Sequence, residues 1–467
     1  MLFYAILFVS FFLVALIIRL YRSVFHDLAQ NSLALVNALL SGHEEDVKIK
    51  QVEKNTNRLL FSLLKMLLTL LVAFAIGSIP VVIYVVITKV DFSSLDFSSF
   101  YSILFISLGA TAPFVIPAKK KKETGYSELS QLLHHLALDN YNISKKLFRK
   151  ETKKIIRRKG LEKRKDFVII SGLARAGTTS LMNDLSRIDD FVSLSYANMP
   201  FLMCPNLWAK FYKPKTNHLK ERSHKDGIMI GLNSNEALEE YFFKVKADDS
   251  YIQETHLLEY NIKEEDYSDY LDYQNIVKLD NKKIYLAKNN NFILRYKSMR
   301  AFNEDFLMVI LYRDPLTHAA SLLEKHRYYS SLQKEDPFVL EYMNWLGHHE
   351  FGLNQKPFVF SDSKDFLNTD KNSINFWLES WINYYRYVLT LQHPNTILIN
   401  YNAYCENPEE VIRTIVKKTG IQTSIPDYQA FKNKRKTDAK ASKELLEEAQ
   451  EIFGKLTNKS NLSALAP

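Results

Sequence analysis

Two glycines lie five residues apart, at Gly172 and Gly177, after a short apolar run and before a row of hydroxyl residues. The stretch from Ser171 to Ser180 reads Ser-Gly-Leu-Ala-Arg-Ala-Gly-Thr-Thr-Ser. Glycines at this spacing let the backbone turn tightly, so that successive N–H groups face inward, and a helix that follows presents its positive N-terminal end to the same point. The stretch therefore predicts a binding site for an anion.

The loop departs from the pattern of nucleoside triphosphatases at one position. The spacing fits G-x-x-x-x-G-K-[ST], but Thr178 stands where the lysine would be. That lysine reaches the outer phosphates, and such enzymes also need an aspartate for Mg²⁺. Here the nearby cation is Arg175, two residues before Gly177. Taken alone, the motif also suits a glycine loop that merely joins a strand to a helix.

A second arginine stands at the end of another apolar run. Phe306 to Leu311 is typical of a buried strand, and it is followed by Tyr-Arg-Asp-Pro, in which the arginine is Arg313. Ser321 lies eight residues further on, two turns into a predicted helix. The guanidinium and the hydroxyl can converge on one phosphate. Alone, the same pattern also fits a salt bridge at a strand end.

Together the two motifs resemble those of sulfotransferases. Arg175 to Thr179 is similar to the 5′-phosphosulfate loop of tyrosylprotein-type and bacterial members, and Arg313 with Ser321 keeps the spacing of the family's 3′-phosphate motif. Weaker similarity covers further segments, namely Glu221–Gly227, Glu236–Glu240, Lys288–Arg295, His349–Gly352, and Ile397–Tyr401 with Asn407-Pro408. The resemblance spans about residues 167–421.

The resemblance implies a donor substrate, 3′-phosphoadenylyl sulfate, and no metal. The residues expected to bind this donor are Arg175, Ala176, Gly177, Thr178, Thr179, Ser180, Arg313, Ser321 and Tyr401. Arg175 is also expected to act in catalysis, because sulfo transfer passes through a charge-dispersed transition state in which the leaving phosphate must be neutralised.

The acceptor hydroxyl also needs a general base. His224 is the first choice, because a neutral imidazole suits this task near neutral pH. The alternatives are the carboxylates Glu221, Asp226 and Glu240. Lys288 is expected to donate to the bridging oxygen of the sulfate, although a solvated or structural lysine explains its position equally well.

The elements that position these residues are predicted from apolar patterning. Strands are expected at 167–171, 284–287, 306–312 and 396–401, with a helix at 181–188 and a long buried helix at 376–391. Short β-rich runs that alternate with helices indicate an α/β fold, with a P-loop-type, mostly parallel sheet and flanking helices. The last thirty residues favour a polar helical extension.

Three apolar runs precede this region, at 2–18, 66–87 and 100–116. The first is long enough to span when its flanks are counted, and it lacks the basic region and cleavage site of a signal peptide. The second has 22 residues, and the third is short and contains Ser, Thr and Gly. Basic residues gather between the first two runs and after the third, which predicts a multi-pass membrane protein with a cytoplasmic catalytic domain. A re-entrant third run would place that domain on the opposite side.

The expected organisation is a transmembrane region at 1–118, a basic juxtamembrane linker or helix at 119–165 and a catalytic domain at 166–467. The segment between Asn142 and Asp166 contains twelve Lys or Arg and two Glu. This excess of positive charge suits contact with anionic lipid headgroups, and it equally suits a helix face exposed to solvent. Aromatic residues are not interleaved with this run as a nucleic-acid surface would need. The expected partners are the bilayer and a hydroxylated acceptor, either a lipid or a lipid-linked compound.

Composition agrees with a folded protein of more than one unit. The chain has 467 residues, 47% of them hydrophobic and 24% charged, with a formal net charge of +9. Its two cysteines, Cys204 and Cys405, show no metal-ligand spacing. The sequence thus favours a membrane-anchored sulfotransferase, with a P-loop kinase or hydrolase and an inactive nucleotide-binding membrane scaffold as the alternatives.

Overall fold

The computed structural model describes residues 1–40, 45–115, 128–212, 220–221, 229–230, 237–360, 370–433 and 437–460. The chain forms two compact units, Met1–Asn142 and Ile143–Pro467. Their boundary lies within the stretch expected to be a basic linker, because the helix α6 (Tyr141–Lys159) begins at the end of the first unit and continues into the second.

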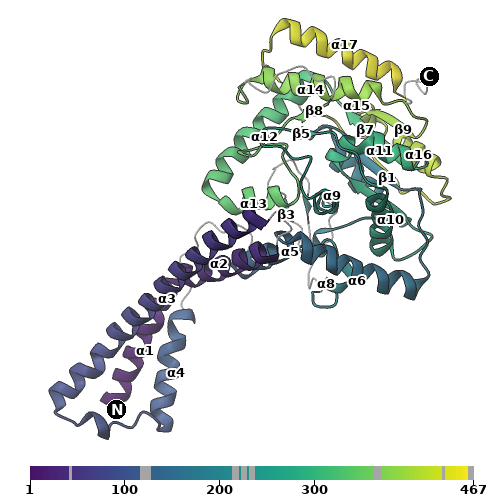
Figure 1. Ribbon diagram of the computed structural model, residues 1–467. Helices are drawn as coiled ribbons and strands as arrows, with labels where there is room; N and C mark the ends of the chain where they lie inside the picture. The colour runs from purple at the N-terminus through teal and green to yellow at the C-terminus, as the bar shows by residue number, and fades with distance from the viewer. Residues whose placement is uncertain are drawn as a thin grey trace. The chain divides into compact units, whose positions relative to one another are not determined.

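The first unit is helical throughout its described secondary structure. Its elements are α1 (Leu2–Leu20), α2 (Arg22–Leu40), α3 (Glu45–Thr88), the 3₁₀ turn η1 (Phe92–Ser94), α4 (Phe100–Val115) and α5 (Glu128–Leu138). Within this unit α1 lies between α3 and α4 (Figure 1). Small residues permit the close approach: a Cβ on Gly77 would lie 2.2 Å from Val14, and one on Gly109 would lie 2.4 Å from the Phe8 carbonyl.

Two of these helices, α1 and α3, are long and apolar enough to cross a bilayer, and α4 is a shorter apolar helix. Length and composition are weak evidence for a membrane span, since a signal sequence passes the same test. The second predicted run, at 66–87, forms the last half of α3, whose polar first half continues the same helix back to Glu45.

The second unit is built on a parallel sheet of five strands among the residues described. The strands are β1 (Val168–Ser171), β2 (Phe191–Val192), β6 (Ile284–Lys288), β7 (Leu307–Tyr312) and β9 (Thr396–Asn400). Their order is β2-β6-β1-β7-β9, and every neighbouring pair is parallel. Four of the five strands match the predicted ones within a residue or two, so the α/β class with a parallel sheet is confirmed.

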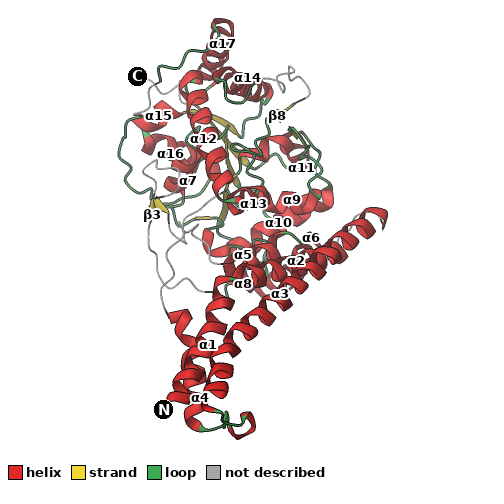
Figure 2. Cartoon of the chain, turned by 90° about the vertical axis from the view of Figure 1, so that its left-hand side faces the viewer, coloured by secondary structure: helices red, strands yellow, loops and turns green. Residues whose placement is uncertain are grey.

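Helices connect the strands and cover both faces of the sheet (Figure 2). They are α7 (Thr178–Leu185), η2 (Tyr196–Asn198), α8 (Pro205–Trp208), α9 (Glu240–Ala247), α10 (Glu264–Lys278), η3 (Asn290–Arg295), α11 (Tyr296–Phe302), α12 (Pro315–Glu335), α13 (Pro337–Trp345), α14 (Ile374–Thr390), α15 (Tyr401–Glu406), α16 (Pro408–Thr419) and α17 (Lys443–Lys459). Two short ladders complete the description, β3 (Lys220–Glu221) with β4 (Met229–Ile230) and β5 (Leu257–Leu258) with β8 (Phe358–Val359).

The main core lies between the sheet and α7 with α16. Alternate side chains of the strands, such as Val168 and Val309, pack there against Leu181 of α7 and Ile412 of α16. On the other face α12, α14 and α17 pack together, and the Tyr385 hydroxyl of α14 donates to the Leu311 carbonyl at 2.7 Å. This packing fixes the carboxyl ends of β1, β6 and β7, where the predicted site residues lie.

Candidate active site

The glycine loop joins β1 to α7, as its sequence predicts. Gly172 has φ +145°, and a Cβ there would lie 2.7 Å from the Leu311 carbonyl of β7. Gly177 has φ +103° and stands at the N-cap of α7, where a Cβ would lie 2.2 Å from the Tyr401 ring. Both glycines are therefore required by backbone conformation and by close approach. The N–H groups of the first turn of α7 point toward the loop, as an anion site needs.

Arg175 adopts a left-handed conformation, with φ +71°, which costs free energy in a residue other than glycine. Two side chains hold the carbonyls on either side of this turn. His318 of α12 contacts the Ala174 carbonyl through Nε2 at 2.7 Å, and Arg313 Nη1 donates to the Arg175 carbonyl at 3.4 Å. Since a carbonyl only accepts, Nε2 of His318 carries the proton. The Arg175 Nε in turn donates to Ser321 Oγ at 3.4 Å.

Arg313 lies directly after β7 and is 6% exposed. Burial lowers the pKa of Arg313, and the charge of Arg175 acts in the same direction. Its Nη2 donates to Asn433 Oδ1 at 3.0 Å and its guanidinium lies 5.1 Å from the Tyr401 ring centre, but its buried Nε has no hydrogen-bond partner in the described part of the chain. A buried cation with an unsatisfied donor is the environment that an anionic ligand completes.

The two motifs predicted from sequence thus lie together. The order of the strands explains why: the chain leaves β1 toward β2 and β6 on one side, whereas β7 and β9 lie on the other. In open parallel sheets ligands bind at such a reversal, beyond the carboxyl ends of the strands. Arg175 follows β1 and Arg313 follows β7, so both cations stand at the reversal.

Lys288, the last residue of β6, also reaches the glycine loop. It is 8% exposed, and its Nζ donates to Thr179 Oγ1 at 3.0 Å. This buried contact argues against a solvated lysine, one of the two explanations that the sequence left open.

The remaining predicted residues of the loop take different positions. Thr178 is 3% exposed, with its methyl group over Gly172. Ala176 is fully buried in the core. The Ser180 hydroxyl lies 3.5 Å from the Tyr404 hydroxyl and so faces α15. Donor binding by the Ser180 side chain stays a prediction.

Of the proposed bases, His224 and Asp226 lie outside the described residues, and the side chain of Glu221 is not described. Glu240 is described, and its two oxygens accept from the two Nη atoms of Arg295 at 2.7 and 2.6 Å. This buried, bidentate ion pair gives Glu240 a structural partner, and its role as a base stays a prediction.

Glu239 and Asn289 belong to the same network, although sequence reasoning did not single them out. Asn289 follows Lys288 and donates from Nδ2 to both Glu239 and Glu240, at 2.9 Å each. Burial raises the pKa of Glu239 to about 7. The doubled glutamate and the asparagine after a strand were visible in the sequence, but their pairing across fifty residues was not.

In the described part of the chain, no group of three or more His, Cys, Asp or Glu side chains is placed so that it could hold a metal ion. The arrangement that is present, two arginines and a lysine around a glycine loop and a helix N-terminus, can bind two anionic groups of one ligand.

No family model matches the chain, and no curated protein matches it in sequence. Its structure is similar to solved bacterial sulfotransferases. One, from Mycobacterium tuberculosis, is 14% identical with a TM-score of 0.39, covering 80% of this chain and 91% of that one. A second, from Alicyclobacillus acidocaldarius, is 15% identical with a TM-score of 0.33, covering 64% and 98%. A third, from Mycobacterium avium, is 10% identical with a TM-score of 0.34, covering 69% and 76%.

Proposed function

We propose that the chain is a sulfotransferase that transfers a sulfo group from 3′-phosphoadenylyl sulfate to a hydroxyl acceptor. The observation that carries the proposal is the contact between two basic sites at neighbouring strand ends, in which Arg313 after β7 reaches the Arg175 carbonyl in the loop after β1. A ligand with phosphates at both its 3′ and 5′ positions suits this pair of sites. A nucleoside triphosphate would leave the buried Arg313 without an anion.

In this proposal each group has a distinct task. Arg175, the N–H groups of residues 176–179 and the hydroxyls of Thr178 and Thr179 bind the 5′-phosphosulfate end, while Arg313 and Ser321 bind the 3′-phosphate. Lys288 neutralises charge on the leaving phosphate, and Tyr401 borders the nucleotide. The donor supplies the sulfo group, and the chain supplies positioning and charge. His224 is proposed as the base that takes the acceptor proton.

Calorimetry of the full chain tests the donor site. Adenosine 3′,5′-bisphosphate should bind without Mg²⁺, about tenfold or more tighter than adenosine 5′-monophosphate, because a buried arginine gains a charge-assisted bond to the extra phosphate. ATP should bind weakly with or without Mg²⁺. If ATP in the presence of Mg²⁺ binds more tightly than adenosine 3′,5′-bisphosphate, the chain is instead a kinase or hydrolase.

We also propose that the first unit anchors the enzyme in a membrane, with the catalytic unit in the cytoplasm. Apolar side chains along α3 support this, since only 11% of its most hydrophobic window is buried, and soluble proteins rarely expose such a surface. The basic residues that flank the apolar runs support the orientation. A reporter fused to the C-terminus should be active in the cytoplasm, and a luminal or periplasmic signal would contradict the orientation.

The proposed acceptor is a membrane lipid or a lipid-linked hydroxyl compound, because an anchored site meets such acceptors by a search confined to the bilayer surface. Membranes incubated with sulfur-35-labelled donor should incorporate label into the organic-solvent extract. Label in soluble glycan or protein would reject the lipid acceptor. Donor binding with no labelled product would instead indicate an inactive nucleotide-binding scaffold.

A further inference from the structure

Basic side chains form a continuous row along one face of α6, which we call the basic stripe. Its members are Lys146, Arg149, Lys150, Lys153, Lys154, Arg157 and Arg158, all exposed. Their spacing alternates between three residues and one, which places them on a single side of a helix. At 1.5 Å per residue the stripe is about 18 Å long.

The opposite face of α6 is fixed to the second unit. Phe148 is 1% exposed and packs edge-on against Phe242. Glu151 accepts from the backbone N–H groups of Asn206 and Leu207, at 3.0 and 2.6 Å, at the start of α8. Ser144 lies 3.0 Å from the Tyr241 hydroxyl. The helix is therefore part of the catalytic unit, and the stripe has a fixed outward direction.

The charges of the stripe have no counter-charge in contact among the described residues. Within the described residues none of its members makes an ion pair, whereas Lys145 beside it pairs with Asp248 at 2.6 Å. Other exposed helices of the same unit do carry compensating pairs one turn apart. Arg413 pairs with Glu409 in α16 and Lys455 with Glu451 in α17, each at 2.5 Å. A face selected only for solvation would resemble α16 and α17, since like charges one turn apart destabilise a helix.

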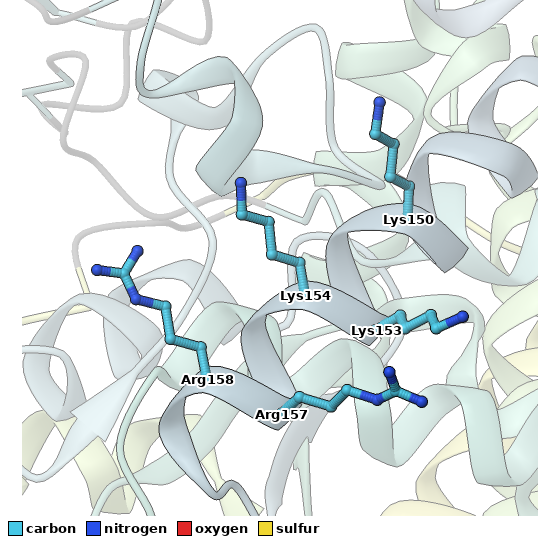
Figure 3. A pocket seen from close by; sticks show the side chains of 5 residues that line it. All are labelled: Lys150, Lys153, Lys154, Arg157 and Arg158. Carbon is cyan, nitrogen blue, oxygen red and sulfur yellow. The ribbon is translucent and has the colours of Figure 1, made fainter.

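The side chains leave a shallow hollow of 440 Å³ between them, lined by Lys150, Lys153, Lys154, Arg157 and Arg158. Figure 3 shows two rows, with Lys150, Lys154 and Arg158 projecting along one line and Lys153 and Arg157 along another. The array is long, regular and positive, and it contains no carboxylate. Such a surface suits a partner that presents many anionic groups on a plane.

We propose that the basic stripe binds the surface of a bilayer that contains anionic lipids. Two observations favour lipid over nucleic acid. No exposed residue of α6 is aromatic, so this helix offers no exposed ring on which a base could stack. In the sequence α6 follows the apolar helix α4 with one further helix, α5, between them, and basic segments near apolar helices are attracted to anionic headgroups. The stripe lies on a different element from the nucleotide loop, so either proposal can fail without the other.

Lysine acylation of the full chain in lipid nanodiscs, read by mass spectrometry, tests the proposal. In discs with about 30% phosphatidylserine, Lys150, Lys153 and Lys154 should react about fivefold more slowly than in pure phosphatidylcholine. The difference should vanish in about 1 M salt, where the Debye length falls to about 3 Å. Lys455 on α17, which both triple variants keep, serves as the internal reference whose rate should not change.

Two triple variants with equal changes of net charge provide the control. Lys150→Glu with Lys154→Glu and Arg158→Glu should abolish the lipid-dependent protection of Lys153. Lys417→Glu with Lys418→Glu and Lys443→Glu, on exposed positions of α16 and α17, should keep it. Equal labelling rates in the two kinds of disc would overturn the proposal. Protection by an added polynucleotide but not by phosphatidylserine would overturn it in favour of nucleic acid.

Discussion

The Nζ atom of Lys288 lies 3.0 Å from Oγ1 of Thr179, so the end of β6 is joined to the first turn of α7. The register of the sheet produces this contact, because Lys288 pairs with Ile170 of β1 just before the chain enters the glycine loop. A strand end, unlike a mobile surface loop, holds a lysine in one place. The ammonium group is thus positioned beside the loop before any ligand binds.

We predict that Lys288→Met loses sulfo transfer by about 100-fold while it retains binding of adenosine 3′,5′-bisphosphate within a few-fold. The reason is that a positioned donor contributes most where negative charge develops in the transition state. Transfer of label from donor to the membrane fraction measures the first quantity, and calorimetry measures the second.

Lys282→Met is the matched control, since Lys282 is an exposed lysine at the entrance to the same strand. It should transfer label at the parent rate. If Lys288→Met instead loses bisphosphate binding and transfer to the same extent, Lys288 contributes to ground-state binding alone, contrary to the prediction.

Arg313→Ala should weaken binding of adenosine 3′,5′-bisphosphate by about 1.5–3 kcal/mol, and Ser321→Ala by about 0.5–1.5 kcal/mol. The arginine has the larger effect because it is charged, buried and has an unsatisfied Nε among the described groups. Calorimetry with adenosine 5′-monophosphate is the control. A similar loss for this ligand, which lacks the 3′-phosphate, would show that the substitutions act by disturbing the loop.

His318 is predicted to position Arg175 through the Ala174 carbonyl. His318→Leu removes the donor and leaves a buried carbonyl unsatisfied, so bisphosphate affinity should fall by about tenfold. His318→Gln keeps an N–H donor and should restore most of that affinity. If both variants bind equally well at equal melting temperature, the contact has no part in ligand binding.

The sequence predicted the strands that position the site because they are fully buried and apolar on both faces, as in β7, where all six residues are buried. The resemblance also implied that Arg175 and Arg313 bind the same donor. The structure brings them together because each follows a strand of the same parallel sheet. The edge strand β2 was missed, since Phe191–Val192 is two residues long and has no periodicity to recognise.

Contacts between distant segments could not be predicted. The sequence pattern predicts only that His318 lies on a buried helix face. Its contact with the Ala174 carbonyl follows from the packing of α12 on the glycine loop. Asn433 reaches Arg313 from 120 residues away. The ion pair of Glu240 with Arg295 likewise depends on α9 folding against η3, which no spacing in the chain encodes.

The last prediction concerns Glu239, which is 2% exposed and accepts from the Tyr270 hydroxyl and from Asn289. Burial raises its pKa in the folded protein to about 7, against 4.5 for the free group, and the neighbouring Arg295 opposes this shift only in part. Between these two pH values the folded state keeps a proton that the unfolded state has lost. The stability contributed by Glu239 is therefore fully present below pH 4.5 and is lost as the pH rises to about 7.

Glu239→Gln should remove this dependence, because the amide resembles the protonated acid at every pH. Relative to the parent, the variant should gain about 3 kcal/mol in the free energy of unfolding between pH 4.5 and pH 7.5. Urea denaturation followed by tryptophan fluorescence, to which the buried Trp377 and Trp381 contribute, measures this difference. A constant difference between Glu239→Gln and the parent across this pH range would mean that Glu239 does not titrate in the folded state as burial predicts.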